Sequence, residues 1–98
     1  MNLHGQVAVV TGAASGIGRA LCHELAREGM RLGLLDRDSR GLASLTEELR
    51  KAGTVCAQTA AEVSDRHGTR SAIQGLATEL GPVDTRCLCR DHRRNLRR

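Results

Sequence analysis

The chain has 98 residues, enough for one small domain, and 40% of them are hydrophobic, yet Phe, Tyr and Trp are all absent. A core must therefore be aliphatic, and no tyrosine is available for acid–base chemistry. The formal net charge of +4 is unevenly placed, because residues 85–98 hold six arginines and one acid while the rest holds nine basic residues against ten acids. This distribution excludes a basic binding face spread over a whole domain.

The cysteines and the hydropathy pattern bear on the cellular compartment. Residues 1–6 are polar and do not resemble a signal peptide, and no apolar run approaches the roughly 20 residues needed to cross a bilayer. We therefore expect a reduced, cytoplasmic protein without a membrane partner. The four cysteines follow no regular disulfide spacing: Cys22, Cys56, Cys87 and Cys89.

Strand-like and helix-like segments alternate along most of the chain. Strands are expected at residues 6–12, 31–36 and 54–59, and helices at residues 17–29, 38–53 and 64–81. Ser39 is the expected N-cap of the second helix, and Ser64 or Asp65 that of the third. The β-α-β-α-β-α order with short connections predicts an α/β fold with three parallel strands and right-handed crossovers.

The pattern changes near the C-terminal end. A fourth strand is expected to begin at Val83, but the apolar pattern stops at Thr85. We therefore predict one domain over residues 1–84 and an irregular, Arg-rich tail over residues 85–98.

The most specific motif is TGAASGIG at residues 11–18, between the first strand and the first helix. Gly12 permits a tight turn, Gly16 lets the backbone approach a pyrophosphate, and Gly18 lets the helix pack close to the sheet. The N-terminus of the helix suits a diphosphate, and Ser15 can donate a further hydrogen bond. Asp36 ends the second strand, eighteen residues beyond Gly18, near the spacing expected of the acid that holds the adenosine ribose.

These motifs, together with LLD, AEVSD and GPVD in this order, resemble the short-chain dehydrogenase/reductase family. The resemblance covers residues 3–84, about the first third of a typical member. It implies a partial Rossmann fold and an oxidoreductase that passes hydride between a nicotinamide cofactor and an alcohol or carbonyl.

The resemblance also assigns a cofactor site. Asp36 would hold the ribose and favour NAD over NADP by repelling a 2′-phosphate, whereas Arg37 beside it could accept that phosphate. Glu62 and Val63 would lie at the adenine, where the family usually has Asp-Val. The pyrophosphate side would be held by Gly12, Ser15, Gly16, Ile17 and Gly18.

The family's catalytic Ser and Tyr-x-x-x-Lys have no counterpart in this sequence. No tyrosine occurs, and the only lysine, Lys51, falls in the second predicted helix. We therefore assign no catalytic residue and predict no dehydrogenase turnover by this chain alone. The family's dimerisation helices also have no counterpart, so the oligomeric state is left open. Without a fourth strand the first strand, central in the family, would become an exposed apolar edge prone to aggregation.

Three interpretations of residues 85–98 compete. The arginines could bind nucleic acid or another anionic partner, but no aromatic side chain is present to stack on bases. Cys87, Cys89 and His92 could bind a metal, but their spacing is too short for zinc and a fourth ligand is missing. The segment could instead arise from a shifted reading frame or from a spliced or truncated gene. We favour this third interpretation and predict no metal site.

Overall fold

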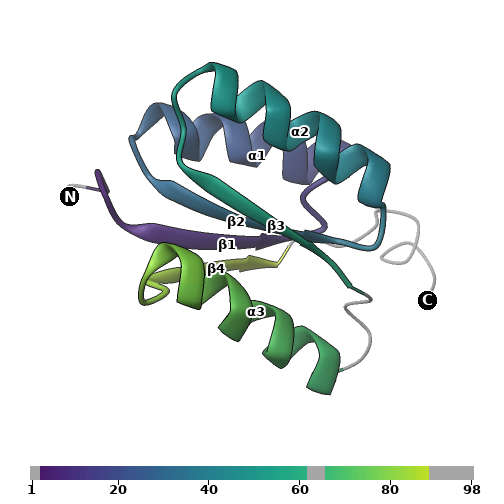
Figure 1. The fold of residues 1–98 in the computed structure, drawn as a ribbon. Helices are drawn as coiled ribbons and strands as arrows, with labels where there is room; N and C mark the ends of the chain where they lie inside the picture. The colour runs from purple at the N-terminus through teal and green to yellow at the C-terminus, as the bar shows by residue number, and fades with distance from the viewer. Residues whose placement is uncertain (1–2, 62–65, 89–98) are drawn as a thin grey trace, which may run out of the picture.

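The computed structural model describes residues 3–61 and 66–88, which form a sheet covered by helices on both faces. The strands are β1 (Val7–Thr11), β2 (Arg31–Asp36), β3 (Cys56–Ala60) and β4 (Thr85–Leu88), and the helices are α1 (Gly16–Arg27), α2 (Ser39–Lys51) and α3 (Arg66–Leu80). The strands are parallel in the order β3-β2-β1-β4. Figure 1 shows α1 and α2 on one face and α3 on the other. The predicted α/β, Rossmann-like fold is confirmed.

β1 is the central strand, and all five of its residues are buried. Its side chains point alternately to the two faces of the sheet, so that both faces of β1 need an apolar cover. Ala8 and Val10 belong to the core under α1 and α2, which also contains Leu32, Leu34 and Leu45. The core under α3 contains Val7, Val9, Leu35, Ile73 and Leu76. The continuous β-branched run in the sequence is therefore explained by burial on both sides.

The structure differs from the sequence-based prediction at residues 85–88. These residues form β4 beside β1, so this part of the chain is not irregular and β1 is not an exposed edge. Asp84 begins the pairing: its backbone N–H donates to the Val7 carbonyl at 2.9 Å, and its carboxylate accepts from the Val7 N–H at 2.8 Å. The backbone groups of a buried strand need partners, and this need overrides a weak side-chain pattern. Residues 89–98, the remainder of the predicted tail, lie outside the described residues.

The N-cap of α2 and the start of β3 also differ from the prediction, and most other element ends shift by one or two residues. Asp38, and not Ser39, is the N-cap of α2, because its carboxylate accepts from the Gly41 N–H at 3.0 Å. β3 begins at Cys56, two residues later than expected. The caps predicted for the third helix, Ser64 and Asp65, lie outside the described residues. Within the described ranges, none of the helices has the length and apolar character that a bilayer span requires.

Candidate cofactor-binding site

The turn between β1 and α1 is closed by hydrogen bonds among its own residues. Gly12 has a φ of 67°, a conformation that side-chain-bearing residues rarely adopt. Its carbonyl accepts from the Ser15 N–H at 3.0 Å and from the Ser15 hydroxyl at 2.6 Å. The same hydroxyl oxygen accepts from the Gly18 N–H at 3.1 Å and so caps α1. Residues 11–18 therefore form the strand-to-helix turn that the motif predicts.

Gly16 and Gly18 have different surroundings. A Cβ added at Gly18 would collide with the backbone carbonyl of Gly12, so this glycine is required for the helix to pack against the turn. A Cβ added at Gly16 would meet no heavy atom within 4 Å. Ile17, between them, is 59% exposed. The N-terminus of α1 is thus open at Gly16, and its first turn contains no acidic side chain that would repel an anion.

Asp36 connects the end of β2 to this turn. One carboxylate oxygen accepts from the Ala14 N–H at 2.9 Å, and the other accepts from the Asp38 N–H at 3.0 Å. The Ala13 N–H also donates to the Leu35 carbonyl, at 3.1 Å. The carboxyl ends of parallel strands meet at one edge of the sheet, which brings Asp36 into contact with a turn 22 residues away.

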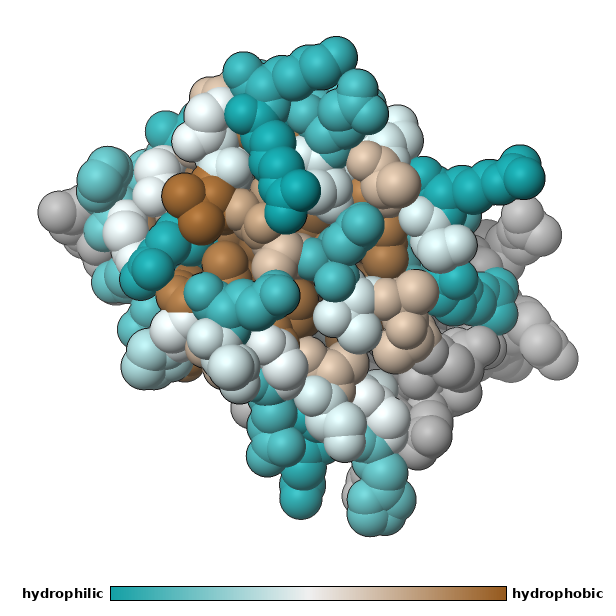
Figure 2. Space-filling model, in the orientation of Figure 1, coloured by the Kyte–Doolittle hydropathy of each residue, from teal (hydrophilic) through white to brown (hydrophobic). Residues whose placement is uncertain are grey.

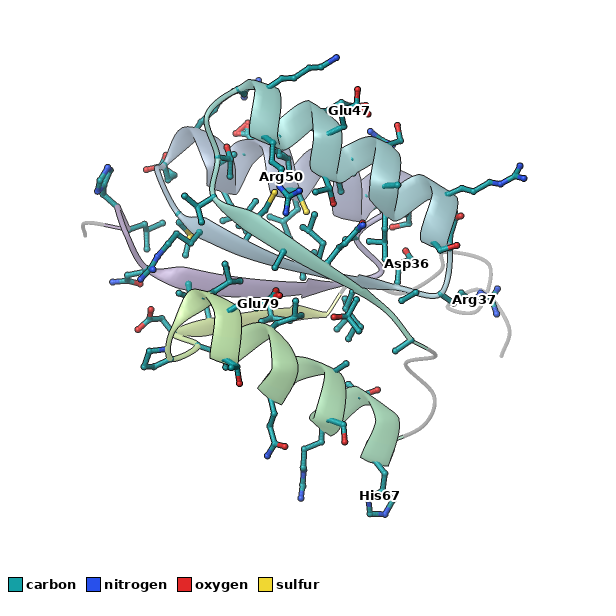
Figure 3. The ribbon with its side chains drawn as sticks, viewed as in Figure 1. Asp36, Arg37, Glu47, Arg50, His67 and Glu79 are labelled. Atoms are coloured by element: carbon teal, nitrogen blue, oxygen red, sulfur yellow. The ribbon has the colours of Figure 1, made fainter. Side chains whose placement is uncertain are left out.

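The other predicted site residues are only partly described. Arg37 is exposed and follows Asp36 directly, and Figure 3 shows the two side chains at the same end of the sheet as the N-terminus of α2. β3 also ends there, since the Ala61 N–H donates to the Asp36 carbonyl at 3.0 Å. Glu62 and Val63 lie outside the described residues, so their predicted place at the adenine is not tested.

A charged contact between α1 and α2 was missed by the sequence analysis. The guanidinium of Arg19 donates to the Glu48 carboxylate at 2.6 Å, and the His23 ring lies 3.0 Å from its other oxygen. These two hydrogen bonds, that of Arg19 first, lower the pKa of Glu48. The sequence does place Arg19 and His23 four residues apart on one face of a helix, but this spacing does not identify their partner on α2. The contact joins α1, the helix that follows the glycine turn of residues 11–18, to α2.

The remaining predictions for the C-terminal segment are not tested. The described residues contain no group of three or more His, Cys, Asp or Glu side chains placed to hold a metal ion. Cys89 and His92, the other members of the suggested metal site, lie outside the described ranges, as do five of the six tail arginines. Nucleic-acid binding and metal binding by this segment stay sequence-based hypotheses.

The family model described as short chain dehydrogenase matches residues 6–87. The chain therefore belongs to the short-chain dehydrogenase family. Among curated relatives, a glycine betaine reductase of Emericella nidulans is 42% identical over 87 residues, which are 89% of this chain and 7% of the relative. A D-threitol dehydrogenase of Mycolicibacterium smegmatis is 35% identical over 82 residues, 84% of this chain and 32% of the relative.

Solved structures give the same assignment. A short-chain dehydrogenase/reductase from Burkholderia phymatum, in complex with NAD, superposes with a TM-score of 0.84 at 34% identity, covering 88% of this chain and 31% of that one. An NAD⁺-bound xylitol dehydrogenase superposes with a TM-score of 0.83 at 26% identity, covering 88% and 33%. The chain thus spans at most about a third of the length of these relatives.

Proposed function

We propose that this chain binds NAD through the glycine turn and Asp36, as the cofactor-binding part of an oxidoreductase. The observation that carries the proposal is the hydrogen bond between the Ala14 N–H and the Asp36 carboxylate at 2.9 Å. It holds Asp36, the residue expected to bind the ribose, beside the turn expected to bind the pyrophosphate. The NAD complexes of two structural neighbours support it. NAD would supply a hydride acceptor, and NADH a hydride donor.

The residues of the turn have separate tasks in this proposal. Gly16 leaves room for the pyrophosphate at the N-terminus of α1, where free N–H groups and the helix dipole favour an anion. Gly12 and Gly18 shape the turn itself. Ser15 caps α1 with a hydroxyl whose single proton already goes to the Gly12 carbonyl, so its main role is to hold the turn. Ile17 supplies an exposed apolar contact at the same place.

The preference for NAD over NADP rests on charge. The Asp36 carboxylate would bind the two ribose hydroxyls of NAD and would repel a phosphate at the 2′ position. Arg37 is the neighbouring cation that weakens this repulsion. Glu62 and Val63 are proposed to contact the adenine, as the family resemblance implies.

Catalysis is not expected from these 98 residues alone. They contain no tyrosine, and a positioned general acid or base contributes roughly 10²- to 10⁴-fold in rate. We therefore propose cofactor binding without measurable NADH formation from alcohols, and we assign no substrate and no oligomeric state. The cytoplasmic location expected from the sequence is part of the proposal.

Calorimetric titration tests the cofactor site. NAD should bind the 98-residue chain, and Gly16→Val should weaken binding at least about tenfold, because the added side chain would fill the space left for the pyrophosphate. Gly75→Val is the matched control, since a Cβ at Gly75 in α3 also meets no heavy atom within 4 Å. It should leave the affinity unchanged.

Titration with NADP tests the role of Asp36. The ratio of NADP to NAD affinity should rise in Asp36→Ala and fall in Arg37→Ala. Far-ultraviolet circular dichroism of each variant shows whether the turn and α1 still fold, since Asp36 also holds Ala14. Equal NAD affinity in the wild type and a folded Gly16→Val variant would contradict the proposed site.

A further inference from the structure

β3 is the outermost strand on its side of the sheet, as far as the described residues extend. The Leu32 N–H donates to the Val55 carbonyl at 3.0 Å, and the Ala61 N–H donates to the Asp36 carbonyl at 3.0 Å. Backbone groups in a parallel ladder alternate between the two sides of a strand. Odd-numbered residues of this segment therefore face β2, and the backbone groups of the even-numbered ones face outward: Cys56, Gln58 and Ala60.

One of these outward-facing groups is occupied by an arginine. The Arg50 guanidinium, in the last turn of α2, donates to the Cys56 carbonyl at 3.0 Å. Figure 3 shows Arg50 between α2 and β3. The contact lies at an open groove of about 470 Å³ lined by Ala43, Thr46, Glu47, Arg50, Lys51 and Gln58. The space outside this part of the strand is therefore not filled by the described chain.

The sequence of this edge suits pairing with another strand. Residues 55–60 read VCAQTA, with no charge, glycine or proline to oppose strand addition. Val55 is 56% exposed, and Figure 2 shows apolar surface between the polar side chains on the face that β3 crosses in Figure 1. Two copies related by a two-fold axis would bring identical uncharged segments together in antiparallel order. A second copy of this chain is thus the natural occupant.

We propose that Arg50 blocks this self-association by covering the first outward-facing carbonyl of β3. A strand arriving from a second copy must break the charge-assisted hydrogen bond between Arg50 and Cys56 before it can pair along the whole edge. The guanidinium also places a positive charge next to an otherwise uncharged strand.

Sedimentation velocity of the full chain tests this role. Arg50→Ala should lower the concentration at which the protein self-associates by about tenfold or more, because neither copy then has a charge-assisted hydrogen bond to break before pairing. Lys51→Ala is the matched control, because it removes the same charge from the same turn but breaks only an exposed contact with Glu47. It should behave like the wild type. Arg50→Met, which keeps an unbranched apolar stem, replaces Arg50→Ala if that variant does not fold.

A second substitution identifies the edge involved. The Ala60 N–H faces outward, so Ala60→Pro removes a donor that an added strand needs without breaking a bond to β2. The Arg50→Ala, Ala60→Pro double variant should return to the wild-type association. Unchanged association of folded Arg50 variants would overturn the proposal. Association that Ala60→Pro does not reverse would also overturn it, because pairing would then occur elsewhere, for instance at β4.

Discussion

β1 is bordered by two strands that the sequence specifies very differently. On one side, β2 contributes four consecutive buried residues and ends in Asp36, whose carboxylate holds the glycine turn. On the other side, β4 is four residues long and is introduced by the double contact between Asp84 and Val7. Buried side chains hold β2 in the sheet, whereas the contacts described for β4 are its backbone pairing and the carboxylate of Asp84.

This difference shows which forces act on each side. A strand that lies between two others and under helices on both faces needs apolar residues at almost every position, which leaves a readable pattern. A strand that is added to satisfy backbone groups needs only an extended conformation. The first kind of strand positions the candidate site. The second kind removes the apolar edge that β1 would otherwise present.

Replacing Gly18 should cause the largest loss of stability, because this residue packs inside the turn that Asp36 of β2 contacts. The Cβ of Gly18→Val would collide with the Gly12 carbonyl, a backbone atom that cannot move without opening the turn. We expect a loss of about 3 kcal/mol or more in the free energy of unfolding, measured by urea denaturation. Gly16→Val is the control and should lose much less. Similar losses for the two variants would show that the turn is not packed as described.

A proline scan of β4 should have the next largest effect. Val7 and Val9 face β4, because the Val7 carbonyl accepts from the Asp84 N–H, and the register pairs Val9 with Arg86. In a parallel ladder Val9 bonds to the residues on either side of its partner, so the Cys87 N–H points toward β1 and the Arg86 N–H away from it. Cys87→Pro should cost about 2 kcal/mol, since it leaves the buried carbonyl of Val9 in β1 without its donor. Arg86→Pro should cost clearly less in the same denaturation experiment. If both variants match the wild type, β4 contributes nothing to the stability of β1.

Much of the fold and the turn could be predicted because one-dimensional patterns report burial and backbone conformation. The alternation of apolar strands and amphipathic helices identified six elements. The spacing from Gly18 predicted that Asp36 lies near the turn, and the structure shows its carboxylate bonded to the Ala14 N–H, 22 residues away. β4 could not be predicted in this way, because its pairing depends on a neighbour already in place. The contact of Arg19 with Glu48 depends on how two helices pack, which no local pattern specifies.

Glu48 is expected to give the smallest effect and to act only on the β2 side. Its carboxylate is exposed, and hydrogen bonds from Arg19 and then His23 lower its pKa below the ordinary value of 4.5. A carboxyl whose pKa is lower in the folded chain stabilises the fold above the unfolded pKa, and this stabilisation is lost as the pH falls through the folded pKa. Glu48→Gln should therefore lower the melting temperature slightly at pH 7, and the difference should vanish in acid.

The control for Glu48 is its neighbour. Glu47 contacts only Lys51 on its own helix among the ion pairs of the described residues, so Glu47→Gln removes the same charge without separating α1 from α2. Hydrogen exchange then distinguishes the two sides of β1: Glu48→Gln should speed exchange in α1 at neutral pH and leave the amides of β4 unchanged. Faster exchange in β4 as well would mean that the two sides unfold together, and that the backbone-paired strand depends on the helix contact across the sheet.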